Sequence, residues 1–213
     1  SQEIIGADAP VGTPFGERLM VYADYTASGR CLGFVEKYIQ NLQRIYANTH
    51  TEDDISGRSM THLLEQAEQA IKNSVNAGPD GRIICVGTGA TGAIDKQQQI
   101  IGVALPPATR QNLTAMLKDA VGDEADRRFS DYLEQNQPVV FVGPYEHHSN
   151  EISWRENLAT VVEVNLDSDG SVDLRHLEEL LQDRRYLGRK RIGSFSAASN
   201  VTGMLTPVHE MAA

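Results

Sequence analysis

The sequence predicts an α/β fold in which helices flank a mainly parallel sheet. Three short stretches rich in apolar residues have the length of strands, at Val139–Val142, Thr160–Val164 and Arg191–Ala197. Between the last two, apolar residues recur at helical spacing over Leu174–Leu187, directly after Asp173, a residue type that favours the helix N-cap. Because strands alternate with helices, we expect a layered structure around one sheet.

The N-terminal part of the chain predicts an arm followed by two helices. Residues 1–30 open with a mixture of glycine, proline and polar residues that has no period, which is typical of an arm or connector. Apolar residues then recur at helical spacing over Gly33–Ala47 and Ser59–Asn76. A further helical segment at 106–137, rich in charge in its second half, is predicted to be a peripheral insertion.

Charge and composition exclude several classes of partner. The formal net charge of -10 argues against nucleic acid and against an anionic membrane, because both require a basic surface. No apolar stretch approaches the roughly 20 residues that span a bilayer, and the N-terminus lacks the features of a signal peptide. We therefore expect a cytoplasmic protein. Cys31 and Cys85 are too few for a disulfide framework and lack zinc-site spacing, and Cys85 is expected to be buried in an apolar run.

A glycine-rich turn marks a candidate anion site. The apolar run Arg82–Val86 predicts a strand, Gly87–Gly92 a turn, and Ala93–Ile101 a helix. Such a turn lets backbone N–H groups approach an anion, and the start of the helix adds favourable partial charge. Phosphate is the natural ligand for this arrangement.

The glycine turn is also compared with two nucleotide-binding motifs. The letters satisfy G-x-G-x-x-G, but a dinucleotide-binding Rossmann fold also requires an acidic residue roughly 20 positions later, at the end of the next strand. Here Ile101–Pro107 contains no acid, and the next convincing strand begins only at Val139. A Walker loop is excluded because no Lys-Ser or Lys-Thr closes the turn. A tight turn without a ligand remained as the structural alternative.

Four short motifs occur in an order that resembles one enzyme family. They are Tyr22–Ser28, Gly89-Ala90-Thr91, Glu146–Asn150, and Ser199-Asn200 with Gly203. They resemble the opening strand and turn, the phosphate loop, the histidine motif and the asparagine motif of the class V aminotransferases and cysteine desulfurases. This resemblance covers most of residues 20–208.

The resemblance implies pyridoxal 5'-phosphate as the cofactor and a role for each motif. Gly89, Ala90 and Thr91 would bind the phosphate, His147 would stack on the ring and help to move protons as the catalytic residue, and Asn200 would hydrogen-bond the phenolic oxygen. Gly92 departs from the family, which often has an acid after this threonine. Without the resemblance, His147 would read as an exposed loop histidine, Thr91 as a helix cap and Asn200 as part of a turn. No set of metal ligands is expected.

The resemblance also implies a fold and an activity. Residues 31–213 would be an incomplete large domain of a fold-type-I pyridoxal-phosphate enzyme, a homodimer that acts on an amino acid, as a cysteine desulfurase or a class V aminotransferase. In the family, the Schiff-base lysine and the acid that contacts the pyridine nitrogen follow the asparagine motif, so the chain alone is expected to be inactive. The alternatives are a nucleotide-binding Rossmann-type domain and a catalytically dead interaction module on the same scaffold.

Overall fold

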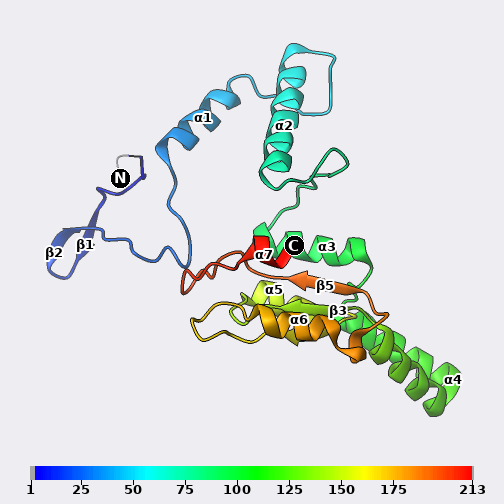
Figure 1. Cartoon of the computed structure of the whole chain (residues 1–213). Coiled ribbons are helices and arrows are strands. Elements are labelled where there is room, and N and C mark those ends of the chain that lie inside the picture. Colours follow the sequence, from blue (N-terminus) through cyan, green and yellow to red (C-terminus); the bar gives the residue numbers. More distant parts are fainter. Residues whose placement is uncertain (1–2, 213) are drawn as a thin grey trace. The chain divides into compact units, whose positions relative to one another are not determined.

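The protein is described by a computed structural model that covers residues 3–212 (Figure 1). The chain divides into two compact units, one ending at Ile84 and the other beginning at Cys85. Each unit is described separately. Within the described residues, no helix combines the length and the apolar character that a bilayer crossing requires.

The first unit contains a β-hairpin and two helices. The predicted arm includes strands β1 (Pro10–Thr13) and β2 (Gly16–Leu19), which pair antiparallel. Helices α1 (Gly33–Gln43) and α2 (Ile55–Ser74) confirm the two predicted helical stretches, although α2 begins four residues earlier than expected. The early start has a local cause, since the Asp54 side chain accepts a hydrogen bond from a backbone N–H of the first turn.

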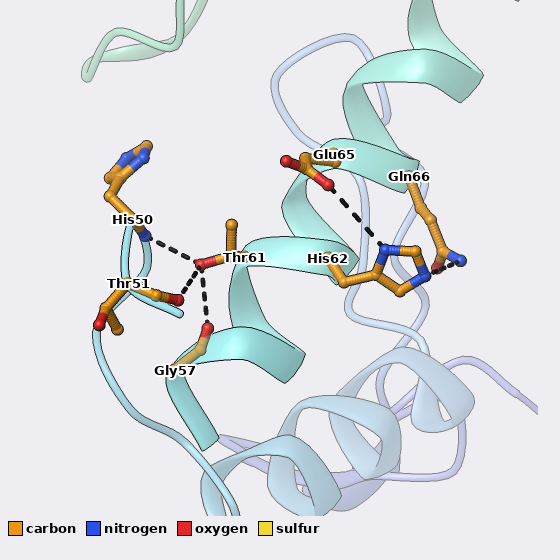
Figure 2. Close-up of polar contacts among 7 residues, drawn as sticks. All are labelled: His50, Thr51, Gly57, Thr61, His62, Glu65 and Gln66. Carbon is orange, nitrogen blue, oxygen red and sulfur yellow. Dashed lines mark hydrogen bonds and ion pairs between the residues drawn. The ribbon is translucent and has the colours of Figure 1, made fainter. Parts of the chain in front are cut away.

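The segment before α2 is attached to the first turns of that helix by one hydroxyl group (Figure 2). Thr61 Oγ1 contacts the carbonyl oxygens of Gly57 and Thr51 at 2.9 and 3.2 Å, and it accepts a hydrogen bond from the His50 backbone N–H at 3.0 Å. His50 has a φ of 65°, in the left-handed region. These contacts hold the turn that leads into α2.

The second unit is an α/β structure of five helices, a short 3₁₀ helix and a three-stranded sheet within the described residues. Its elements in chain order are α3 (Gly89–Ile101), α4 (Pro107–Asn136), β3 (Val139–Val142), α5 (His148–Glu156), β4 (Thr160–Glu163), α6 (Leu174–Gln182), the 3₁₀ helix (Arg184–Tyr186), β5 (Arg191–Ser194) and α7 (Val208–Ala212).

The sheet is parallel, as predicted, with strand order β4-β3-β5. The central strand β3 is buried along its whole length, and Val139 lies opposite Thr160 on one side and Arg191 on the other. A strand covered on both faces is expected to be continuously apolar, and the sequence VVFV of β3 has this property.

Two apolar cores lie on opposite faces of the sheet because side chains alternate along a strand. Val139 and Phe141 pack on one face with residues of α6, whereas Val140 and Val142 pack on the other with Trp154 of α5. Contacts also join α3 to α5 on this second face. The flanking helices therefore enclose β3 from both sides.

Helix α4 confirms that the 106–137 segment is helical. Its backbone is interrupted at Gly122, which has φ 80° and ψ 167°, so the two halves do not form one straight helix. None of its residues is buried.

Several boundaries differ from the sequence-based expectations. The predicted strand Arg82–Val86 is wrong, because this stretch is irregular and pairs with no strand of the described chain. Cys85 is accordingly exposed instead of buried. Strand β5 ends at Ser194, three residues early, and the helix predicted over Leu174–Leu187 ends at Gln182 before the 3₁₀ turn.

Candidate functional site

A cavity of about 500 Å³ opens at the carboxyl ends of β3 and β5. Its lining combines the first turn of α3, the loop and helix that follow β3, and the chain that leaves β5. The lining residues are Ala90, Thr91, Ile94, His147, Ser149, Asn150, Ser194, Phe195, Ser196, Ala198 and Asn200. The structure therefore brings Ala90, Thr91, His147 and Asn200 to one place, whereas Gly89 does not line the cavity.

The topology of the sheet explains this position. The chain leaves β3 toward α5 on one face and later returns through α6 on the other face, so that β4 and β5 lie on opposite sides of β3. The chain after β3 leads to α5 on one face, whereas the chain after β5 leads to α7, whose Met211 packs against the core on the other face. Ligands of open α/β sheets bind in the crevice at such a point.

Helix α3 presents its N-terminus to the cavity. The helix begins at Gly89 instead of near Ala93, so that Gly89, Ala90 and Thr91 form its first turn and not a loop before it. The N-cap residue Thr88 has a φ of 65° and caps no backbone N–H with its side chain. The first N–H groups of a helix have no partner within the helix, and they therefore remain available to an anion.

Gly92 is explained by the shape of this turn. A Cβ atom at Gly92 would collide with the carbonyl oxygen of Gly87 and would lie 2.5 Å from Thr88 Oγ1. The chain thus folds tightly over the position after Thr91, and any larger residue requires the turn to move. The turn as it stands therefore leaves no room for the acid that the resemblance implies at this position.

A buried glutamine fixes α3 against α5. Gln98 is fully buried, its Nε2 donates to Ser153 Oγ at 2.9 Å, and its Oε1 accepts from Asn157 Nδ2 at 2.7 Å. Both polar ends of the buried amide are therefore satisfied, as burial requires. The first turn of α3 is in this way held in register with the helix that carries the histidine motif.

His147 is the N-cap of α5 as well as a lining residue. Its Nδ1 accepts a hydrogen bond from the Ser149 backbone N–H at 3.1 Å and lies 2.8 Å from Ser149 Oγ. The side chain is exposed, so its ring can be reached from the cavity. Histidine is not among the preferred capping residues, and no helix was predicted at this position.

Glu146 is the residue whose role the sequence did not indicate. Its Oε1 accepts from the backbone N–H groups of Gly143 at 3.3 Å and Ser196 at 2.7 Å. Its Oε2 accepts from Asn150 Nδ2 at 2.8 Å and from Ser196 Oγ at 2.6 Å. One carboxylate thus joins the segments that follow β3 and β5, which are the two sides of the cavity.

A second set of contacts continues this connection into the core. Trp154 is fully buried, and its Nε1 donates to Ser194 Oγ at 3.1 Å and to Asn150 Oδ1 at 3.3 Å. Ser194 Oγ in turn donates to Asn150 Oδ1 at 2.6 Å. The end of β5 and the helix after β3 are therefore joined beneath the cavity.

The segment that carries Asn200 is held by its neighbour. Buried Ser199 accepts through Oγ from the backbone N–H groups of Val201 and Thr202 at 3.3 and 3.2 Å. The Ser199 backbone N–H donates to Met204 and its carbonyl accepts from Gly203, at 2.9 Å each. The turn is therefore fixed by Ser199, and Asn200 at its tip lines the cavity.

The donor set of the cavity suits a phosphorylated aromatic ligand. Backbone N–H groups at a helix start, with a threonine hydroxyl, bind phosphate oxygens. An imidazole offers a flat face to a ring, and a carboxamide can donate to a phenolic oxygen. In chemical type, the residues present fit pyridoxal 5'-phosphate. The fold and this cavity together define an α/β unit with a crevice at a topological switch point, at which a helix N-terminus lies.

Comparison with known proteins finds similarity to one enzyme family. The family model "Aminotransferase class-V" matches residues 129–213. "Probable cysteine desulfurase" of Chlamydia muridarum is 39% identical over 78 residues, which are 35% of this chain and 18% of that protein. "Probable cysteine desulfurase" of Halalkalibacterium halodurans is 26% identical over 198 residues, 91% of this chain and 40% of that protein. "Probable cysteine desulfurase 2" of Mycobacterium leprae is 34% identical over 92 residues, 41% of this chain and 20% of that protein.

The matched residues 129–213 and the similarity to probable cysteine desulfurases support the resemblance of this chain to the class V aminotransferase and cysteine desulfurase family. It spans less than half the length of each of these relatives.

Proposed function

We propose that this chain provides the phosphate- and ring-binding part of a pyridoxal-phosphate enzyme that acts on an amino acid, of the cysteine desulfurase type. The observation that carries the proposal is the cavity in which the first turn of α3, His147 and Asn200 meet. These residues come from three separate segments of the sequence, and each offers a different contact that the cofactor requires.

The roles follow from the groups that line the cavity. The backbone N–H groups of Ala90 and Thr91, with the Thr91 hydroxyl, would hold the phosphate. His147 would lie against the ring, and the Asn200 amide would donate to the phenolic oxygen. When bound, the cofactor withdraws electrons from the amino acid's α-carbon. Glu146 would act indirectly, because it holds the two sides of the cavity together.

Turnover is proposed to need more than these residues. The chain contains five lysines, and none of them is among the residues that line the cavity. Covalent attachment of the cofactor requires a lysine at the ring, so we expect residues 1–213 alone to bind the cofactor reversibly without turning over substrate. A fold-type-I domain is part of the proposal, and the family match over residues 129–213 supports it. A homodimer and a cytoplasmic location are proposed from the resemblance of the motifs.

Binding to the 213-residue protein tests the proposal. Isothermal titration should detect pyridoxal 5'-phosphate and should show much weaker binding of pyridoxal, which lacks the phosphate. Thr91→Val removes the hydroxyl at nearly constant volume, and loss of a hydrogen bond to a charged group should weaken binding about tenfold or more. Thr114→Val, an exposed threonine on α4 outside the cavity, is the matched control and should not change the affinity.

Three results would contradict the proposal. Equal affinity for pyridoxal and its phosphate would remove the phosphate site. An equal effect of the two threonine variants would place the ligand elsewhere. Tighter binding of a dinucleotide than of pyridoxal phosphate would favour the nucleotide-binding alternative.

A further inference from the structure

The protonation of His147 can be read from its partner. A backbone N–H is always a donor, so the Ser149 N–H, 3.1 Å from His147 Nδ1, requires a lone pair on that nitrogen. The Ser149 hydroxyl lies on the same nitrogen at 2.8 Å and is able to donate to it. A neutral imidazole carries a proton on only one of its two nitrogens. Because Nδ1 must keep its lone pair here, the proton is on Nε2.

The position of Ser149 is fixed by the helix that it begins. Its carbonyl oxygen accepts from Ser153 Oγ at 3.0 Å, one turn later. Trp154, which follows Ser153 in α5, is fully buried in the core. The Ser149 N–H therefore cannot turn away from His147 without disturbing the first turn of a packed helix.

We propose that Ser149 is a positioning residue for His147, which it holds as the tautomer with the proton on Nε2. In this state His147 offers the cavity a hydrogen-bond donor and not a base. For Nε2 of the neutral ring to accept a proton, the proton that it already carries would first have to move to Nδ1. There it would point at the Ser149 N–H, which is itself a donor. The meaning of this donor for a cofactor or substrate rests on the proposed function, whereas the tautomer itself does not.

Two other histidines of the same chain are internal references. His176 Nδ1 accepts a hydrogen bond from the Asn165 backbone N–H at 3.0 Å, which imposes the same tautomer on an unrelated ring. His148 is adjacent to His147, and within the described residues its ring has no hydrogen bond but a tilted contact with the His147 ring. We expect His147 to behave like His176, and His148 to show both tautomers.

The test is a long-range proton–nitrogen correlation spectrum of the nitrogen-15-labelled 213-residue protein at about pH 8, above the range in which histidines ordinarily titrate. This spectrum separates protonated from unprotonated ring nitrogens. We expect an unprotonated Nδ1 and a protonated Nε2 at His147. Ser149→Ala keeps the backbone donor, which alone requires the lone pair on Nδ1, so its His147 spectrum should match the original. Ser149→Thr should also keep the original spectrum, and neither variant should change His176.

Mixed tautomers at His147 in the unmodified protein would overturn the proposal. So would a protonated Nδ1 at His147 in the Ser149→Ala spectrum. The measurement needs no cofactor, which separates it from the proposed function. If His147 shows the expected tautomer but pyridoxal phosphate does not bind, the positioning role stands and the proposed function fails.

Discussion

Replacement of Glu146 by glutamine tests whether one carboxylate holds the cavity together. The two carboxylate oxygens accept four hydrogen bonds, from Gly143, Asn150 and twice from Ser196. A glutamine amide turns one acceptor oxygen into a donor NH₂ group. Placed at the Oε1 position, this group would face two backbone N–H donors. Placed at the Oε2 position, it would face the NH₂ group of Asn150 and the Ser196 hydroxyl. Of these two donors, only the hydroxyl can turn and accept a hydrogen bond instead.

The Asn150 amide cannot flip to relieve the conflict. Its Oδ1 already accepts from Ser194 Oγ at 2.6 Å and Trp154 Nε1 at 3.3 Å, so that a flip would break these contacts. At least one hydrogen bond to a charged acceptor is therefore lost, which costs about 1.5–3 kcal/mol. We expect Glu146→Gln to lower the free energy of unfolding of the second unit by about 2–3 kcal/mol.

The chain provides its own reporter for this measurement. Its one tryptophan, Trp154, is buried within the same network, so that its fluorescence during urea unfolding reports the second unit alone. With the usual dependence on urea, the midpoint should fall by about 1 M or more. The matched control is Glu151→Gln on α5, where a partly exposed ion pair with Arg155 at 2.8 Å should contribute less than about 1 kcal/mol. Equal midpoints for the two variants would refute the role given to Glu146.

Three further predictions concern single residues. Gly92→Ala should weaken the binding of a phosphate ligand more than it changes the free energy of unfolding, because the added Cβ collides with the Gly87 carbonyl oxygen in the turn. An unchanged affinity in a titration would contradict this prediction. Asp173→Ala should destabilise the second unit by about 1 kcal/mol, since Asp173 caps two N–H groups of α6, and a midpoint shift near zero would contradict it. The side-chain hydrogen bond from Arg185 lowers the pKa of Asp183. The interaction therefore stabilises the fold above the ordinary aspartate pKa, and this contribution is lost as the pH falls through the lowered pKa of Asp183. Arg185→Ala should move the pKa of Asp183 upward in an NMR titration.

The sequence predicted the central elements of the second unit because their patterns are local. The apolar run Val139–Val142 is a strand with the predicted bounds, and Asp173 caps α6 as its residue type suggested. The run Arg82–Val86 has a similar composition but forms no strand. A strand requires a partner, and composition alone does not say whether a neighbouring strand is present.

The site was predicted only in part. The motifs named Ala90, Thr91, His147 and Asn200, all of which line one cavity, although their binding roles remain predictions. The residues that arrange the cavity were not predicted. Glu146 and Gln98 connect segments that are 50 and 55 residues apart in the sequence, and no local pattern reveals such distant partners.

The location of the cavity is a consequence of chain topology more than of the glycine turn. Crossovers between parallel strands are right-handed, so a crossover on the opposite face of the sheet must move in the opposite direction. Helices α5 and α6 lie on opposite faces, as the two cores on either side of β3 show. The chain therefore has to place β4 and β5 on different sides of β3, as observed. This arrangement opens a crevice between the ends of β3 and β5, where Glu146 and Ser196 lie opposite each other and are joined by hydrogen bonds. The first turn of α3 adds backbone N–H groups, proposed to bind an anion, to a crevice that the strand order has already formed.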